Sequence, residues 1–210
     1  MIIKLVHPST ILISGPTGCG KTEFVGRLIR EKMFDKFPSR IIWVYSYWQY
    51  FYNEFVNLVE FTTMFDEKFY ETLDPATRNL VILDDQMTRV GDSKVLSRLF
   101  TEGSHHRNIS VIYIVQNLFD KGKEHRTISL NAQYMILFKN PRDISQIECL
   151  SRQMFPSNNK FLVSAFRDAT TSPYGYLLVD LRPESEEDIR VRTKIFPGEM
   201  SDIYQPFKSV

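Results

Sequence analysis

Three short stretches of the sequence carry residues that could bind and cleave a nucleoside triphosphate. The first is GPTGCGKT, from Gly15 to Thr22, which has the spacing G-x-x-x-x-G-K-[ST] between a short apolar run and an amphipathic segment. Glycines at this spacing let consecutive backbone N–H groups turn toward phosphate oxygens, and a helix beginning there adds the positive end of its dipole. Lys21 would reach the β- and γ-phosphates, and the Thr22 hydroxyl would bind Mg²⁺. The predicted nucleotide-binding residues are Gly15, Pro16, Thr17, Gly18, Cys19, Gly20, Lys21 and Thr22.

The second stretch is NLVILDDQ, in which an apolar run ends on Asp84 and Asp85. Ligands of open α/β sheets bind at the carboxyl ends of the strands, so both acids are expected beside the phosphate loop. We predict that Asp84 holds Mg²⁺ through water and that Asp85 is the general base for the attacking water. A solvated turn after a strand is the alternative, and the phosphate loop upstream favours the functional interpretation. Asp85 is shorter than the glutamate usual at this place, so water or backbone must make up the difference.

The third stretch is SVIYIVQN, in which a buried apolar run stops at Gln116. In the branch of P-loop ATPases with an inserted strand, this strand lies between the strand before the phosphate loop and the strand that ends in the acids. An amide at its tip can donate to the γ-phosphate and accept from the attacking water. The alternative is a glutamine that only satisfies backbone groups of the following loop.

Short β-rich runs alternate with helical patterns, which predicts an α/β fold with a mostly parallel sheet covered on both faces. Strands are expected over residues 10–14, 40–47, 80–84, 109–115, 134–139 and 174–181. Helices are expected over residues 21–34, 48–57, 93–103, 143–155 and 159–168. An acidic turn and a last edge strand should follow within 182–196. We divide the chain into an ATPase domain over 1–196 and an extended tail over 197–210 that docks on a neighbour.

The composition suits a globular domain of 210 residues, with 43% hydrophobic and 24% charged residues and a net charge of +1. This balance argues against a surface coated in basic charge, although a basic strip confined to one loop or ring lumen is compatible with it. Cys19 and Cys149 are far apart, which indicates neither a disulfide framework nor a zinc site. His105 and His106 have no ligand-type partners nearby. No apolar run is long enough for a membrane span, so an intracellular protein is expected.

An aromatic stripe follows the second predicted strand, and its members could serve as core, as a subunit contact or as a platform for single-stranded bases. We favour core plus subunit contact. The stripe consists of Trp43, Tyr45, Tyr47, Trp48, Tyr50, Phe51, Tyr52 and Phe55.

Taken together, GPTGCGKT, VILDDQ and EGSHHRNISVIYIVQNLF, followed by NAQYMILFKNPRD, resemble the genome-packaging ATPases of large double-stranded DNA viruses. These are the poxvirus-type members of the HerA/FtsK superfamily of P-loop ATPases. The resemblance covers residues 10–155, with the motifs in the family's order. It implies a P-loop NTPase fold with an inserted strand, ATP and Mg²⁺ as ligands, and a homo-oligomeric ring that threads double-stranded DNA into a capsid.

The resemblance also implies residue roles that depend on neighbouring subunits and on DNA. Rings of this superfamily complete each ATP site with an arginine from the next subunit, and Arg142 is the first candidate, followed by Arg107. Either arginine could instead be an ordinary surface residue in an ion pair. A basic loop after Gln116, carrying Lys121, Lys123 and Arg126, could reach the ring lumen and grip DNA phosphates. The alternative is a solvated surface loop in which Asp120 and Glu124 balance the charge. Viral capsid or portal-vertex proteins are the implied partners, without a membrane. The implied location is the virion assembly site of an infected cell, with association with the virion as a further possibility.

Two other classes compete with this interpretation. A nucleoside or nucleotide kinase shares the length and the phosphate loop, but the sequence has no arginine-rich lid segment. A non-motor DNA assembly factor would bind ATP and turn it over slowly. DNA-stimulated ATP hydrolysis separates the three.

Overall fold

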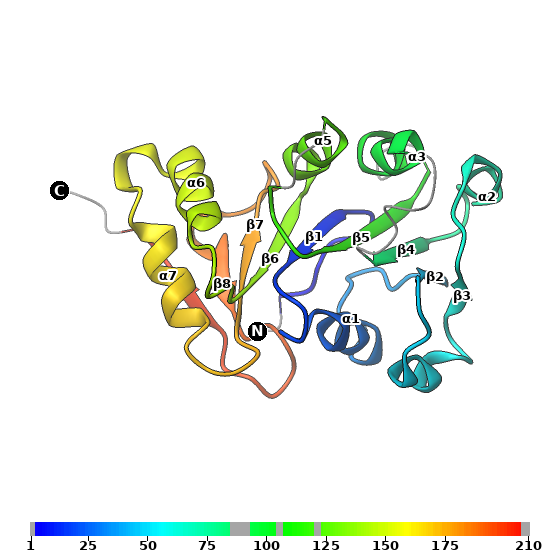
Figure 1. The fold of residues 1–210 in the computed structure, drawn as a ribbon, viewed down its shortest axis with the longest axis horizontal. Coiled ribbons are helices and arrows are strands. Elements are labelled where there is room, and N and C mark those ends of the chain that lie inside the picture. The colour runs from blue at the N-terminus through cyan, green and yellow to red at the C-terminus, as the bar shows by residue number, and fades with distance from the viewer. Residues whose placement is uncertain (1–2, 85–92, 104–106, 120–122, 207–210) are drawn as a thin grey trace.

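The computed structural model describes residues 3–84, 93–103, 107–119 and 123–206. Within these residues, nine strands form one sheet in the order β3-β2-β4-β5-β1-β6-β7-β8-β9 (Figure 1). The strands are β1 Thr10–Ser14, β2 Arg40–Val44, β3 Glu60–Thr62, β4 Asn79–Asp84, β5 Ile109–Val115, β6 Tyr134–Phe138, β7 Tyr176–Asp180, β8 Val191–Thr193 and β9 Asp202–Tyr204. The predicted α/β fold with a mostly parallel sheet is confirmed.

Helices cover both faces of this sheet. On one face lie α1 (Lys21–Arg30) and the 3₁₀ helix η1 (Tyr50–Phe55). The other face carries α2, α3 with the π-helical turn η3, α5, α6 and α7 (Figure 1). These helices span Glu67–Glu71, Ser93–Arg98, Leu99–Gly103, Lys123–Asn131, Ser145–Met154 and Phe161–Ala169, and two short 3₁₀ turns, η4 and η5, span Pro156–Asn158 and Glu187–Ile189.

Strand β5 lies between β1 and β4, as predicted for the branch with an inserted strand. Strands β1 to β6 pair in parallel wherever they are neighbours, with Ser14 beside Val115 and Asp84 beside Ile114. The antiparallel strands β7, β8 and β9 extend the sheet on the other side of β6. Because parallel strands end at the same edge, the tips of β1, β4 and β5 come together.

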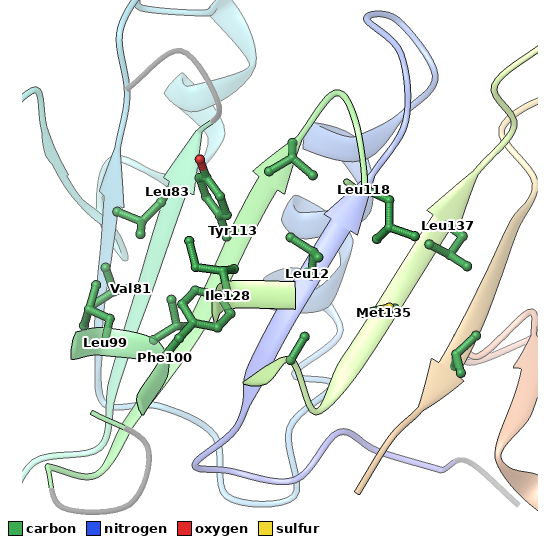
Figure 2. Close-up of a cluster of buried hydrophobic side chains, with 14 of the residues drawn as sticks. Leu12, Val81, Leu83, Leu99, Phe100, Tyr113, Leu118, Ile128, Met135 and Leu137 are labelled. Carbon is green, nitrogen blue, oxygen red and sulfur yellow. The ribbon is translucent and has the colours of Figure 1, made fainter. Parts of the chain in front are cut away.

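Each central strand contributes alternate side chains to two separate cores. One core, beneath α3, α5, α6 and α7, includes Leu12, Leu83 and Tyr113 (Figure 2). The other, beneath α1, includes Ile13 and Ile114. Burial on both faces explains why these strands are continuous apolar runs in the sequence rather than alternating ones.

Helix α1 is shorter than predicted, because it ends at Arg30 rather than near Phe34. Lys32 has a φ of 50°, and the N–H groups of Lys32 and Met33 donate to the carbonyls of Ile29 and Leu28 at 3.2 and 2.9 Å. This is the hydrogen-bond pattern of a Schellman turn, in which a lysine stands where glycine is usual. The chain then turns back so that Phe34 bridges to Leu5.

Other predicted boundaries also differ from the structure. The strand expected over 40–47 ends at Val44, the helix expected over 48–57 is only η1, and the strand expected from 174 begins at Tyr176. Sequence reasoning missed the short elements β3 and α2. Strand β8 is not the edge strand that the sequence predicts. Residues 202–204, in the predicted tail, form strand β9, which pairs with β8 and is itself the edge of the sheet.

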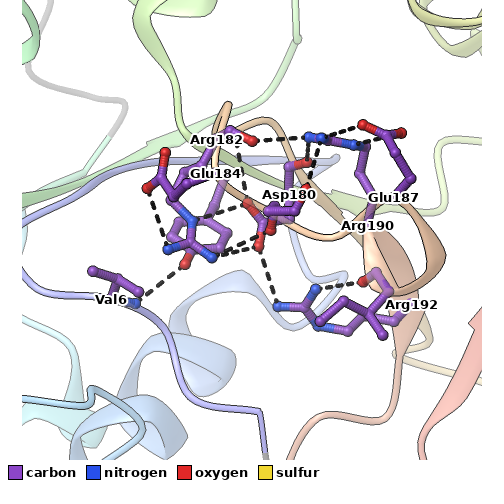
Figure 3. Close-up of polar contacts among 10 residues, drawn as sticks. Val6, Asp180, Arg182, Glu184, Glu187, Arg190 and Arg192 are labelled. Atoms are coloured by element: carbon purple, nitrogen blue, oxygen red, sulfur yellow. Dashed lines mark hydrogen bonds and ion pairs between the residues drawn. The ribbon is translucent and has the colours of Figure 1, made fainter.

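A buried ionic cluster lies at the end of β7, opposite the phosphate-loop edge (Figure 3). Asp180 is fully buried and accepts hydrogen bonds from Arg182 Nε and Nη2 at 3.0 and 2.9 Å. Arg192 is 1% exposed, and its Nη2 lies 3.7 Å from Asp180 Oδ2. Burial raises the pKa of Asp180, but the arginine hydrogen bonds and charges outweigh it, so the pKa lies below its usual value. Burial lowers the pKa of Arg192.

Candidate functional site

The phosphate loop joins β1 to α1, and its glycines are required by the backbone and by packing. Gly18 and Gly20 have φ values of 79° and 103°, in the left-handed region that glycine tolerates best. At Gly15, an added Cβ would lie 2.7 Å from Phe138 Cβ and 2.8 Å from Cys19 Sγ, so no side chain fits there. These glycines give the loop the backbone conformation that its sequence spacing predicts, and phosphate binding there stays a prediction.

Lys21, the first residue of α1, holds its ammonium group against the phosphate loop. Its Nζ donates to the carbonyl oxygens of Gly15 at 2.5 Å and Pro16 at 2.9 Å. The residue is only 9% exposed, so its ammonium group contacts this loop rather than solvent. Two backbone carbonyls hold the cation in place, and negative phosphate oxygens are stronger acceptors for the same donor.

A pocket of about 420 Å³ is lined by candidate functional residues from all three of the sequence stretches described above. Lys21 and Thr22 reach it from the start of α1, Asp84 from the tip of β4, and Gln116 from the residue after β5. The sheet register explains this meeting, because β4, β5 and β1 are neighbours, and the Gly15 N–H donates to the Val115 carbonyl at 3.2 Å. Asp85 lies outside the described residues.

Tyr52 is a site residue that sequence reasoning placed in the aromatic stripe and gave no role in the site. Its side chain is fully buried, and its hydroxyl donates to Asp84 Oδ2 at 3.5 Å. Burial raises the pKa of Tyr52, and the negative charge of Asp84 raises it further, so the phenol stays protonated and remains a donor. The only sequence signal was a tyrosine instead of a phenylalanine within a buried segment.

The remainder of the aromatic stripe divides between core and surface. Trp43 and Phe55 are buried with Tyr52, whereas Tyr47 and Tyr50 are 68% and 89% exposed. The core part of that prediction is confirmed, and the subunit contact stays a prediction.

The two candidate finger arginines lie at opposite edges of the sheet. Arg142 follows β6 at the phosphate-loop edge, is exposed, and forms no ion pair among the residues that the structure describes. Arg107 precedes β5 at the far edge, where its Nη2 pairs with Glu71 Oε2 at 2.7 Å and its guanidinium lies over the Tyr70 ring. Arg142 is therefore the candidate at the same edge of the sheet as the phosphate loop, and its role as a finger stays a prediction.

The predicted basic loop after Gln116 is partly helical, which corrects the sequence interpretation. Helix α5 begins at Lys123, so Lys123 and Arg126 lie on a helix, anchored by the buried side chain of Ile128. Arg126 is exposed. Lys121 lies outside the described residues.

Mg²⁺ fits the oxygen donors that the pocket offers. Thr22 supplies a hydroxyl and Asp84 a carboxylate, and this metal binds proteins through one or two such ligands while keeping several waters. Among the described residues, no group of three or more His, Cys, Asp or Glu side chains could hold a metal by itself.

Cys19 and Cys149 are both free thiols. No helix in the described part of the chain is long and apolar enough to cross a membrane.

The chain has the fold of P-loop NTPases, as defined by its sheet order, its phosphate loop and the aspartate at the tip of β4. It has the arrangement of the branch with an inserted strand, because β5 lies between β1, which precedes the phosphate loop, and β4. No protein-family model matches the chain, and no curated protein matches it in sequence. Solved structures do share its fold over nearly the full length.

One of these structures is the DNA-packaging ATPase B204 from Sulfolobus turreted icosahedral virus. It has a TM-score of 0.55 and 16% identity, and the match covers 96% of this chain and 100% of that one. The genome-packaging NTPase B204 from Sulfolobus turreted icosahedral virus 2, in complex with AMP, has a TM-score of 0.56 and 14% identity. The match covers 96% of this chain and 98% of that one. The same protein in complex with ATP-gammaS has a TM-score of 0.53 and 14% identity, and the match covers 95% of this chain and 97% of that one. The resemblance carried by the motifs is thus matched at the level of the fold.

Proposed function

We propose that this protein is an Mg²⁺-dependent ATPase that forms a homo-oligomeric ring and translocates double-stranded viral DNA into a capsid. The observation that carries the proposal is the pocket in which Lys21, Thr22, Asp84 and Gln116 meet across three neighbouring strands. A kinase has no evident need for an amide at the tip of β5. The shared fold with a DNA-packaging ATPase supports the same choice.

Each residue of the pocket has a distinct task in hydrolysis. Lys21 exchanges its two loop carbonyls for β- and γ-phosphate oxygens and neutralises their charge. Thr22 and Asp84 hold Mg²⁺, which supplies positive charge to the phosphates. The Tyr52 hydroxyl donates to Asp84 and so restrains the orientation of its carboxylate. Gln116 orients the attacking water, and Asp85 accepts its proton.

Transmission of hydrolysis to DNA depends on groups outside the pocket. Arg142 of one subunit stabilises transition-state charge at the site of the next, a contribution that reaches about 10³–10⁵ in rate for arginine fingers of GTPases. Lys121, Lys123 and Arg126 follow Gln116 directly in the chain and contact DNA phosphates without reading bases. Capsid or portal-vertex proteins are the proposed docking partners at the virion assembly site.

ATP hydrolysis with and without long double-stranded DNA tests the proposal, with Lys21→Ala as the inactive control. DNA-stimulated phosphate release by the natural protein, absent in Lys21→Ala, supports the motor. Phosphoryl transfer to an added nucleoside would refute the motor and establish a kinase. Phosphate release no faster than that of the control would instead point to a non-motor assembly factor.

Mixed rings test the role of Arg142. Arg142→Ala subunits keep an intact pocket, whereas Asp85→Ala subunits keep the arginine. In a mixture, an Asp85→Ala subunit can supply Arg142 to the pocket of an Arg142→Ala neighbour, so activity should return. A mixture that stays inactive while each variant still assembles would contradict a finger acting between subunits.

A further inference from the structure

A second pocket adjoins the phosphate loop on the side of β1 that faces away from Asp84 and Gln116. It has a volume of about 430 Å³ and is lined by Gly18, Cys19, Lys139 and residues 170–175. Lys139 directly follows β6, and residues 170–175 lead into β7, which pairs antiparallel with β6. Both therefore reach the phosphate-loop edge of the sheet, and Gly18 borders this pocket as well as the first one.

Tyr174 occupies an unusual position at this pocket. It has a φ of 61°, in a turn that begins at Ser172 and is closed by a hydrogen bond from the Gly175 N–H to the Ser172 carbonyl at 3.1 Å. With Pro173 at the second position, a positive φ at the third is the pattern of a type II turn, where glycine is usual. A bulky residue held in such a conformation is a feature that clusters at ligand sites.

The conformation brings the Tyr174 ring to the phosphate loop while leaving most of it open. A Cβ placed on Gly20 would lie 3.2 Å from Tyr174 Cδ1, so the ring borders the last glycine before α1. The side chain is nevertheless 71% exposed. A buried packing role does not explain an aromatic ring that is held by a strained turn and exposed beside the loop.

We propose that this pocket holds the purine base of the bound nucleotide and that Tyr174 stacks on it. The inference rests on the proposed function, because Lys21, Asp84 and Gln116 fix the reacting phosphate on the β4–β5 side of the loop. A phosphate chain that runs along the loop then leaves it on the β6–β7 side, where Tyr174 lies. The two fused rings of a purine overlap a tyrosine ring more than a pyrimidine does, while stacking alone treats adenine and guanine alike.

Equilibrium binding of ATP and of inorganic tripolyphosphate, both with Mg²⁺, tests the base site, because only ATP carries a base. Tyr174→Gly should weaken ATP binding by roughly 5- to 150-fold, the range expected for one base stacked on an aromatic ring. Tripolyphosphate binding should change less than about twofold, since the loop itself is intact. Tyr174→Phe keeps the ring and should bind ATP as the natural protein does. The preference for ATP over CTP should shrink in Tyr174→Gly only.

Tyr174→Gly also supplies its own folding control, since glycine adopts a φ of 61° without strain. Its melting temperature without nucleotide should equal or exceed that of the natural protein. Equal losses of ATP and tripolyphosphate affinity would mean that the ring only supports the loop, and unchanged ATP affinity would place the base elsewhere. Either result overturns the inference.

Failure of the base site and failure of the proposed motor give different results, because binding is measured without hydrolysis. A selective loss of ATP affinity in Tyr174→Gly supports the base site even where DNA fails to stimulate turnover in the natural protein. Natural protein that binds neither ATP nor tripolyphosphate would overturn both.

Discussion

Replacing Asp180 with asparagine removes one negative charge from the buried cluster at the end of β7 while keeping the size of the side chain (Figure 3). The amide oxygen of the variant can still accept a hydrogen bond from Arg182. Arg192 is affected more, because it is 1% exposed and its Nε and Nη2 have no hydrogen-bond partner in the described part of the chain. Among the residues that the structure describes, Asp180 is the carboxylate that pairs with Arg192, at 3.7 Å. The substitution therefore leaves a buried guanidinium without a counterion.

Removing one partner of a buried ion pair costs roughly 3–5 kcal/mol, because the remaining charge has lost its solvent without compensation. We expect Asp180→Asn to lower the free energy of unfolding by about this amount. For a domain of this size each kcal/mol shifts the melting temperature by roughly 2–4 °C, so a decrease of roughly 6–20 °C should follow.

Urea denaturation followed by circular dichroism measures the change, and Glu184→Gln is the matched control. Glu184 is paired with the same Arg182 at 3.6 Å but is 65% exposed, so its neutralisation should cost less than about 1 kcal/mol. Adding Arg192→Met to Asp180→Asn removes the stranded charge and should recover most of the lost stability. The reasoning is refuted by an Asp180→Asn loss no larger than that of Glu184→Gln. It is also refuted by a double variant less stable than Asp180→Asn alone.

Further predictions concern the nucleotide pocket and acid stability. Lys21→Ala should abolish detectable ATP binding in an equilibrium assay, and binding at natural affinity would contradict its role at the phosphates. Gln116→Ala should bind ATP normally but lose DNA-stimulated turnover, whereas unchanged turnover would reduce the glutamine to a loop anchor. Tyr52→Phe should raise the Mg²⁺ concentration for half-maximal hydrolysis by up to about tenfold, since one hydrogen bond to Asp84 is worth roughly 0.5–1.5 kcal/mol. An unchanged Mg²⁺ concentration would show that Tyr52 has no role in Mg²⁺ binding. Because Asp180 has a lowered pKa in the folded protein, its contribution to stability is present above the usual value of 3.8 and is lost as the pH falls below it. Acid titration of stability should therefore show a loss below that pH that is absent in Asp180→Asn.

Local sequence was sufficient for the phosphate loop and for the central strands. The loop spacing predicted glycines where the backbone or packing requires them, and Gly15, Gly18 and Gly20 stand at such positions. Strands β1 and β5 have the predicted bounds because their apolar runs end abruptly at Gly15 and Gln116. The order of β4, β5 and β1 was also anticipated, but from the family resemblance rather than from the residues themselves.

Boundaries that depend on side-chain contacts far away in the sequence were less accessible. Helix α1 ends early because Lys32 adopts a left-handed conformation, and no sequence rule predicts this for a lysine. Strand β3 has only three residues and exists because it pairs with β2 at the edge of the sheet. The basic segment after Gln116 becomes a helix from Lys123 onward because Ile128 is buried against the sheet.

The sequence by itself predicted a site for a nucleoside triphosphate, because glycine spacing and a lysine at a helix start are local properties. It also predicted an acid, Asp84, and an amide, Gln116, at strand ends, where the structure has them. Tertiary structure alone decided that Tyr52 contacts Asp84 and that Arg107 lies at the far edge from Arg142. It also decided that Tyr174 borders the loop. Each of these pairings joins residues distant in the chain, and they meet only because the sheet places their strands and loops at particular edges.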